Sequence, residues 1–224
     1  MPKAATRQGP SPLIGRGVVV LTPARVRAAV RKLKEDRTLK PLVAAYPAPE
    51  FQLATDVFAS LASAIVSQQL STKAAATIYD RLLKLIKKKK PDARAVLKCS
   101  VEDLRGVGMS RPKAGYLLDL AEKTLSHELH IERFYDMPDA DVVEEVTQVK
   151  GLGEWSAHMF LMFALNRPDV WPVGDLGIKN AAKRLVGSED HLPLDEMLEL
   201  AEPWRPYRTV ASLYLWDSLD NKPQ

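Results

Sequence analysis

Cysteine is nearly absent from this chain of 224 residues, in which Cys99 is the sole example. One thiol excludes an intrachain disulfide framework, a multi-cysteine zinc site and a four-cysteine iron–sulfur cluster. Long apolar runs are lacking too, because no stretch approaches the roughly 20 apolar residues that a membrane-spanning helix needs. We therefore expect no membrane partner, and no chemistry that depends on clustered cysteines.

Charge of one sign is not strongly in excess either. The chain has 32 lysines and arginines against 28 aspartates and glutamates, a net charge of +4, with 46% apolar and 27% charged residues. This composition is typical of a soluble globular protein. The mild basic excess is compatible with a polyanionic partner but does not require one.

Helix signals recur along almost the whole sequence. Ser100 with Asp103, and Asp141 with Glu144, have the spacing of a capping box at a helix start. The run Met159–Leu165 is apolar on nearly every side, which predicts a helix buried all round. Together with the apolar spacing and the prolines, these signals predict an all-α fold of about ten helices. The main ones are expected over 22–36, 54–70, 72–88, 111–126, 177–186, 193–202 and 206–219.

Two glycines stand close together in the stretch VKGLGEWSA, residues 149–157. Gly151 and Gly153 interrupt two helical patterns, so they predict a tight turn, where glycine tolerates backbone conformations closed to other residues. Main-chain N–H groups beside the start of the following helix favour a phosphate oxygen. The pattern permits two interpretations: a plain corner between helices, or a sequence-independent grip on one strand of DNA.

A lone carboxylate, Asp175, follows the stretch NRPDVWPVG and precedes a helix with an apolar face. Taken alone, an aspartate at a helix start is an N-cap. A catalytic role is compatible with capping, because the helix start would hold the carboxylate in place. The residues by themselves leave both roles open.

These features carry a family resemblance. GLGEWSA (151–157), the apolar helix after it and PVGD (172–175) together resemble the helix-hairpin-helix DNA glycosylase superfamily. The likeness is closest to the DNA-3-methyladenine glycosylase II (AlkA-type) branch, and it covers about residues 25–219. Four motifs in family order are far more specific than any one of them. The other three are SAIVSQQLSTKAA (63–75), LRGVGMSRPKAGYLLDLA (104–121) and WRPYRTVASLYLW (204–216).

The resemblance implies two packed helical subdomains with a helix-hairpin-helix motif and a cleft between them. We expect a flexible leader over 1–20, since this stretch lacks a signal-peptide core, and a glycosylase domain over 21–224. One subdomain is expected over about 72–180 and the other from 21–71 together with 181–224. Some members of the branch carry an additional N-terminal β-rich domain, which this chain is expected to lack.

Members of the superfamily flip a damaged nucleotide out of duplex DNA and cleave its N-glycosidic bond, which starts base excision repair. An alkylated purine of the 3-methyladenine or 7-methylguanine type is already cationic, so it leaves without a general acid. The positive sugar left behind is the unstable element, and one carboxylate beside it can stabilise it or orient water. The resemblance assigns this catalytic role to Asp175 and leaves both versions open.

The residue after the hairpin distinguishes two kinds of enzyme. Bifunctional members of the endonuclease III type have a nucleophilic lysine two residues after the second hairpin glycine. This chain has Trp155 there, and an indole cannot form a Schiff base, which implies a monofunctional glycosylase that uses water. Lys150 is a poor substitute, because it lies on the turn that faces DNA.

The base pocket implied by the resemblance consists of Trp155, Met159 and Trp216. Aromatic faces attract cationic rings by roughly 0.5–2 kcal/mol, and a methionine offers a polarizable contact. Many members of the branch have an aromatic residue where this chain has Met159. Packing in the core is the alternative for all three residues.

The turn Gln68-Gln69-Leu70 matches the wedge region, where a side chain fills the gap that a flipped base leaves. Gln69 aligns best with the wedge, and Leu70 is its apolar neighbour. With Gly151, Gly153 and Lys150, this turn makes up the expected DNA-binding surface.

A monovalent cation is a further expectation at the hairpin. Superfamily hairpins commonly bind one through main-chain carbonyls, so Na⁺ or K⁺ could bind at 148–153. No side-chain metal site and no other cofactor are expected.

Two alternatives to an alkylated-base glycosylase come from the same residues. One is a non-catalytic helix-hairpin-helix DNA-binding module, and the other is a glycosylase of the same superfamily with a different lesion. No Walker-type loop, H-E-x-x-H or G-x-S-x-G points elsewhere. The expected partner is double-stranded DNA with alkylated bases, bound by a monomer. The expected location is the cytoplasm, with nucleoid association in a bacterium, or the nucleus in a eukaryote.

Overall fold

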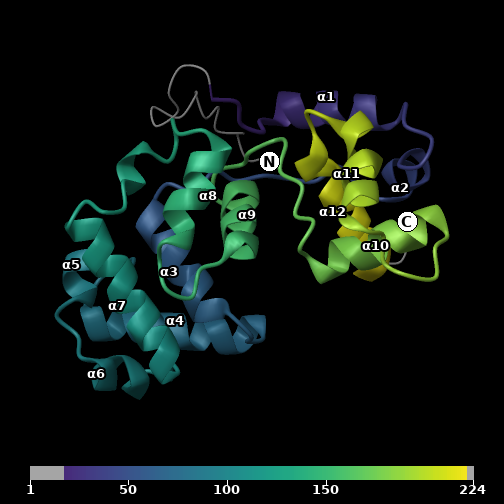
Figure 1. Cartoon of the computed structure of the whole chain (residues 1–224). Coiled ribbons are helices and arrows are strands. Elements are labelled where there is room, and N and C mark those ends of the chain that lie inside the picture. The colour runs from purple at the N-terminus through teal and green to yellow at the C-terminus, as the bar shows by residue number, and fades with distance from the viewer. Residues whose placement is uncertain (1–17, 221–224) are drawn as a thin grey trace, which may run out of the picture.

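The computed structural model describes residues 18–220, and all regular structure in that range is helical (Figure 1). The predicted all-α fold is therefore confirmed. Every helix in this range is too short or too polar to span a membrane. The α-helices in chain order are α1 (Pro23–Leu33), α2 (Lys40–Ala45), α3 (Val57–Ser67), α4 (Thr72–Ile86), α5 (Ala93–Val96), α6 (Val101–Gly106), α7 (Arg111–Leu125), α8 (Asp139–Thr147), α9 (Glu154–Phe163), α10 (Leu176–Val186), α11 (Leu194–Ala201) and α12 (Arg208–Asp220). Two 3₁₀ helices, η1 (Ile131–Arg133) and η2 (Glu202–Trp204), complete the set.

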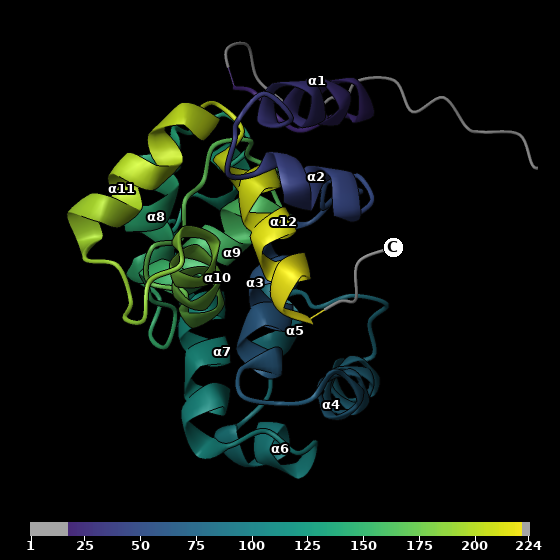
Figure 2. The ribbon, with the colours of Figure 1, turned by 90° about the vertical axis from the view of Figure 1, so that its right-hand side faces the viewer.

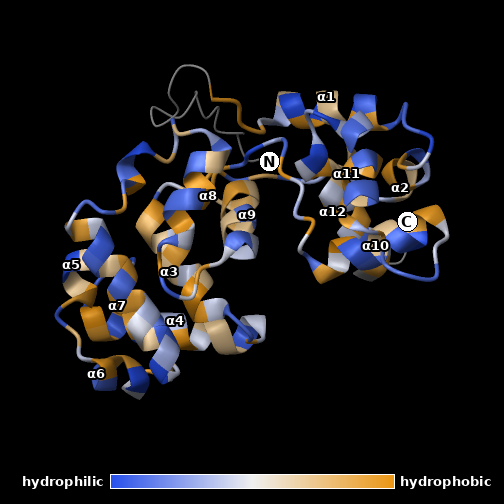
Figure 3. Ribbon diagram, in the orientation of Figure 1, coloured by the Kyte–Doolittle hydropathy of each residue, from blue (hydrophilic) through white to orange (hydrophobic). Residues whose placement is uncertain are grey.

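Helices α3 to α9 gather around one hydrophobic core, on the left in Figure 1. Its centre is α3, where Leu61, Ala62 and Ile65 recur at helical spacing and are at most 1% exposed. This helix packs against α4, α7 and α9. Figure 3 shows α3 mostly in the colours of hydrophobic residues, whereas α1 alternates between hydrophilic and hydrophobic turns. An enclosed helix needs apolar residues on several faces, and a surface helix needs them on one.

Helices α1, α2, α10, α11 and α12 form a second group around a separate core. Its centre is α12, which packs against α1, α2 and α10, as Figure 2 shows. Trp204 and Tyr214 are at most 1% exposed there, and the rings of Trp171 and Trp204 meet edge to face at 5.4 Å. The second group therefore joins segments from both ends of the described chain.

The two cores divide the chain at other positions than the sequence analysis expects. Helix α3 lies in the first group rather than with the terminal helices, and the segment from Trp171 onward lies in the second. Trp171 packs against Trp204, and its indole donates to the carbonyl of Met197 at 2.9 Å. Of the expected leader, residues 1–17 lie outside the described range, and Val20 is buried rather than free.

Local signals predicted some helix starts and missed others. The capping box of Ser100 and Asp103 is confirmed, with both reciprocal bonds present. The one expected at Asp141 and Glu144 is wrong, because α8 begins earlier, directly after Pro138. Acidic residues suit the first turn of a helix, and α8 has Asp139 and Asp141 there. The short helices α2 and α5 were not predicted, since four to six residues give too little periodicity.

A buried arginine, Arg167, lies where the chain leaves the first group for the second. Arg167 is 4% exposed, and its Nη2 donates to the carbonyls of Phe134 and Met137 at 2.8 and 2.9 Å. Its Nη1 lies 3.2 Å from Oδ1 of Asp139. These contacts tie the end of α9 to the loop before α8. A buried charge of this kind is tolerated because both terminal nitrogens are paired or hydrogen-bonded, although its Nε is buried without a partner.

Thr209 continues this junction into the second group. Its Oγ1 donates to the carbonyl of Arg167 at 2.6 Å and accepts from the N–H of Val170 at 3.0 Å, and the residue is fully buried. Thr209→Val keeps the shape and leaves both main-chain groups unpaired. We expect the free energy of unfolding in urea to fall by about 2–4 kcal/mol, because each unpaired buried group costs about 1–3 kcal/mol.

The matched control is Thr77→Val on α4, where the exposed hydroxyl donates only to the carbonyl of Lys73 within its own helix. This change should alter the free energy of unfolding by no more than about 0.5 kcal/mol. Equal effects of the two substitutions would contradict the assigned role of Thr209.

Candidate active site

The turn between α8 and α9 contains the two glycines singled out in the sequence. Gly151 has a φ of +80°, and a Cβ at this position would come within 2.1 Å of Cδ2 in the Tyr116 ring. Gly153 has a φ of −99° and caps the start of α9, and a Cβ added there would have no neighbour within 4 Å. The predicted tight turn is present. Its backbone and its packing require glycine at Gly151, whereas Gly153 is free of both constraints.

Two polar side chains hold this turn in place. Asp119 of α7 is 8% exposed, accepts from the main-chain N–H of Lys150 at 2.9 Å and lies 3.1 Å from its ammonium. The Lys150 side chain is nevertheless 75% exposed. Gln68 Nε2 donates to the carbonyl of Gly151 at 2.7 Å. The hairpin and the predicted wedge turn, 83 residues apart in the chain, are therefore in direct contact.

The predicted wedge turn, residues 68–70, leaves the end of α3 in an unusual backbone conformation. Gln69 is exposed and has a φ of +55°, which residues other than glycine rarely adopt. Leu70 is 39% exposed, and its N–H donates to the carbonyl of Ser67 at 3.1 Å. An exposed leucine beside a strained, exposed glutamine fits a side chain held ready for insertion. Both residues stay candidates for the wedge.

Asp175 accepts three hydrogen bonds. Its Oδ1 accepts from the N–H of Ile178 at 2.8 Å, so the predicted N-cap of α10 is confirmed. The same oxygen accepts from Trp216 Nε1 at 2.9 Å, and Oδ2 accepts from Trp155 Nε1 at 2.7 Å. The two indoles come from different helix groups, Trp155 from α9 and Trp216 from α12. A carboxylate has about four acceptor positions, so the N-cap bond leaves positions free for other donors.

Two residues that sequence reasoning did not single out complete the arrangement. A Cβ at Gly177 would lie 2.9 Å from Cδ1 and Nε1 of Trp216, so glycine lets this indole approach Asp175. The Phe163 ring stacks on Trp216 with a centroid distance of 6.1 Å and an interplanar angle of 29°. Phe163 follows Trp155 and Met159 at intervals of four residues. That spacing places all three on one face of α9 and is the signal that could have found Phe163.

A cleft of about 1230 Å³ runs along this face of α9. Phe163 is 50% exposed, so the prediction that Met159–Leu165 is buried all round is wrong on this side. Trp155, which precedes that run, is also 50% exposed. A run of apolar residues cannot distinguish a helix enclosed by protein from one that lines a cleft. Of the predicted pocket residues, Trp155 and Met159 line the cleft, whereas Trp216 does not and packs against both cores; Asp175 is likewise outside the lining. The cleft is lined by α3 and α9 together with residues including Gln68, Gln69, Lys90, Lys113, Tyr79, Tyr116 and Gly151.

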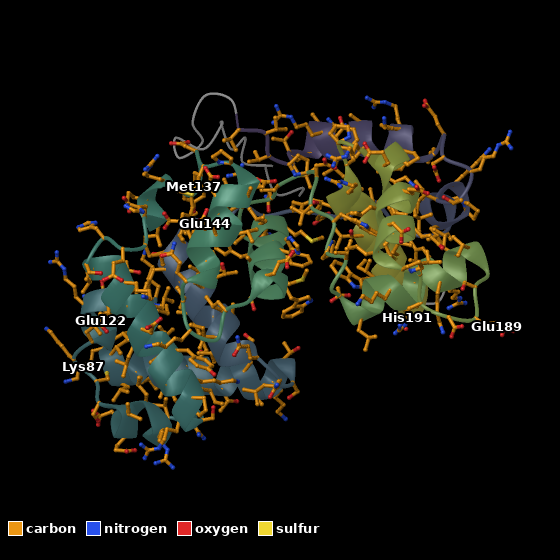
Figure 4. All side chains as sticks on the ribbon, viewed as in Figure 1. Lys87, Glu122, Met137, Glu144, Glu189 and His191 are labelled. Atoms are coloured by element: carbon orange, nitrogen blue, oxygen red, sulfur yellow. The ribbon has the colours of Figure 1, made fainter. Side chains whose placement is uncertain are left out.

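The lysines and histidines near the cleft are engaged elsewhere. Of the two lysines that line it, Lys90 pairs with Asp56, and Lys113 donates to main-chain carbonyls. Burial lowers the pKa of His158, whose side chain is 17% exposed and which does not line the cleft. His191 does not line the cleft either; Figure 4 shows it at the lower edge of the second group, where its Nε2 lies 2.8 Å from Oδ1 of Asn180. The arrangement thus offers a fixed carboxylate and aromatic walls.

The cation expected at 148–153 stays a prediction. Three of the main-chain carbonyls in this turn already accept hydrogen bonds: Val149 from the N–H of Leu152 at 3.0 Å, Gly151 from Gln68, and Gly153 from the N–H of Ala157 at 3.0 Å. A carbonyl oxygen has two lone pairs, so these bonds are compatible with a cation. Among residues 18–220, no cluster of His, Cys, Asp and Glu side chains could hold a metal.

The two hairpin glycines provide a test of this geometry. In Gly151→Ala the methyl group would overlap the Tyr116 ring and demand a left-handed alanine. We expect a loss of more than about 2 kcal/mol in the free energy of unfolding, measured in urea, because overpacking costs about 1–3 kcal/mol and the strain adds to it. In Gly153→Ala the loss should stay below about 1 kcal/mol. Similar losses in the two variants would contradict the distinction.

Comparison with known proteins places this geometry in a family. Residues 62–206 match the HhH-GPD superfamily base excision DNA repair proteins. The Bacillus subtilis protein YfjP is 31% identical over 170 residues, which cover 73% of this chain and 59% of YfjP. A DNA-3-methyladenine glycosidase from Bacillus halodurans is 34% identical with a TM-score of 0.77, covering 86% of this chain and 89% of that one. The Schizosaccharomyces pombe 3-methyladenine DNA glycosylase Mag1, in complex with abasic DNA, is 31% identical with a TM-score of 0.73, covering 85% and 96%. The chain therefore belongs to the HhH-GPD superfamily of base excision DNA repair proteins.

Proposed function

We propose that this protein is a monofunctional DNA glycosylase that flips alkylated bases out of duplex DNA and hydrolyses the N-glycosidic bond. The carrying observation is the carboxylate of Asp175, which an N-cap bond and two indole N–H groups hold in place, one of them from Trp155, a residue that lines the aromatic cleft. Membership of the superfamily and the likeness to two 3-methyladenine glycosylases support this function. The abasic DNA bound by Mag1 supports DNA as the partner.

The chemistry needs little more than this carboxylate. A cationic alkylated purine is a good leaving group, so the transition state is mainly a positive charge on the sugar. A fixed negative group stabilises that charge without having to reorganise, which is the largest single term in many enzymes. Asp175 is fixed by three donors from three different segments of the chain, and its remaining acceptor position can face the sugar or a water molecule.

The cleft suits a flat cationic ring. The half-exposed side chains of Trp155 and Phe163 offer aromatic surface, and Met159 lies between them on the same face of α9. An aromatic face attracts a cation by about 0.5–2 kcal/mol. An alkylated base carries this charge and its undamaged counterpart does not. The pocket would therefore favour the damaged base by electrostatics rather than by shape.

The positions and partners of the lysines favour a monofunctional reaction, because no free lysine among the described residues lines the cleft to act as a nucleophile. The position that would carry a nucleophilic lysine is Trp155, whose indole is bound to Asp175. Lys113 and Lys90 line the cleft, but the first is bound to carbonyls and the second to Asp56.

We expect the reaction to leave abasic sites that break only after alkali or heat, and to give no covalent adduct after borohydride treatment. Strand cleavage without alkali would show that the enzyme is bifunctional.

Asp175→Asn tests the catalytic role directly. An asparagine oxygen can still cap α10 but carries no charge, so DNA binding should persist while base release slows on the order of 100-fold or more. Base release from a duplex with one 7-methylguanine, under single-turnover conditions, measures the rate. The matched control is Asp92→Asn, which changes the N-cap of α5 at a residue that does not line the cleft and should leave the rate unchanged. Retention of the full rate in Asp175→Asn would reduce Asp175 to a structural cap.

A non-catalytic DNA-binding module remains the alternative from another class. It accounts for the hairpin and the mild excess of basic residues, but it gives no reason for two indoles to donate to one carboxylate. The same assay separates the two, since a module would bind the duplex and release no base. That the protein acts as a monomer stays a prediction from the sequence.

A further inference from the structure

One face of α7 holds both of the turns that the proposed function places on DNA. Lys113, Tyr116 and Asp119 follow one another at intervals of three residues, so they lie along one side of the helix. Tyr116 packs against Gly151, and Asp119 binds Lys150, so these two residues hold the hairpin. Lys113, at the start of the same helix, reaches the other turn.

The ammonium of Lys113 is bound to the end of α3. It donates to the carbonyl of Val66 at 2.9 Å and to the carbonyl of Gln68. A cation is favourable at the C-terminus of a helix, where carbonyls lack partners. The side chain is partly buried, and burial lowers the pKa of the ammonium. Lys113 is therefore placed in a specific contact rather than extended into solvent.

The segment that Lys113 holds is the one that carries the backbone strain. Gln68 is its attachment point, Gln69 follows with a φ of +55°, and Leu70 is 39% exposed. A strained turn keeps its shape only when the surroundings over-determine it. Gln68 is held from both sides here, by Lys113 at its carbonyl and through its side chain by the carbonyl of Gly151.

We propose that Lys113 is a positioning residue for base extrusion. It fixes the turn 68–70 relative to the hairpin, so that the side chain of Gln69 or Leu70 can enter the base stack. This inference rests on the proposed function and adds a residue that acts before any bond is broken. In this role Lys113 acts through the turn that it holds and makes no bond to Asp175. Its effect should be large where a base must be pulled from a paired stack, and small where the base is already displaced.

The test compares two duplexes under single-turnover conditions. One carries a single 7-methylguanine opposite cytosine, and the other carries the same lesion in a one-nucleotide bulge, where extrusion costs less. Loss of a hydrogen-bonded charge corresponds to a factor on the order of 10 to 100 in rate. We expect Lys113→Met to lose about that factor on the paired lesion and to act on the bulged lesion nearly as fast as wild type. Lys113→Arg should restore most of the rate.

The control is Lys123→Met on the same helix, where the ammonium is paired with Glu128 at the surface. It should leave both rates unchanged. Circular dichroism and thermal melting establish that the variants are folded. Lys113→Gln, which keeps a neutral donor, serves if Lys113→Met unfolds, with the same expected difference between the two duplexes. An equal loss on both duplexes, or no loss in a folded variant, would overturn the proposal.

A second readout separates this proposal from the proposed function. A 2-aminopurine next to the lesion fluoresces when the stack opens, and it reports extrusion without bond cleavage. If wild-type protein released no base from either duplex, the glycosylase function would fail. The fluorescence rise in wild type, and its reduction in Lys113→Met but not in Lys123→Met, would still test the role of Lys113. An equal rise in all three proteins would overturn it.

Discussion

The candidate site depends on one carboxylate that accepts hydrogen bonds from three donors. Asp175 caps α10, and it also accepts the indole N–H groups of Trp155 and Trp216, at 2.7 and 2.9 Å. These two tryptophans belong to helix groups with separate cores. The carboxylate is therefore a point at which the groups meet. A charged acceptor with three N–H donors is a strong and directional contact, and it orients the aromatic side chains as much as they orient it.

Small residues make this convergence sterically possible. Gly177 leaves room for the Trp216 indole, and Gly151 leaves room for the Tyr116 ring. In each case a flat aromatic ring lies directly against the main chain, which a Cβ atom would prevent. Close approach of a ring to the backbone fixes position through van der Waals contact. The polar contacts, Asp119 with Lys150 and Gln68 with Gly151, then set the register of the hairpin.

The two helix groups contribute different parts of the candidate site. The first provides the hairpin, the turn 68–70 and the face of α9 that lines the cleft. The second provides Asp175 at the start of α10 and Trp216 on α12. A substrate held by the first group would thus meet a carboxylate supplied by the second. The junction at Arg167 and Thr209 is buried and hydrogen-bonded, so it fixes the position of the second group relative to the first.

Local sequence determined four features: the all-α class, most of the long helices, the glycine turn and the capping role of Asp175. Caps, prolines and apolar spacing act within a few residues, so a reader of the sequence can weigh them directly. The family resemblance also named Trp155 and Trp216. Tertiary structure alone decided that both indoles bond to Asp175, that α3 joins the first core, and that Phe163 lines a cleft. It likewise decided that Lys113 reaches the end of α3. Such contacts join residues about 20 to 50 positions apart, and no local pattern encodes which distant partner a side chain meets.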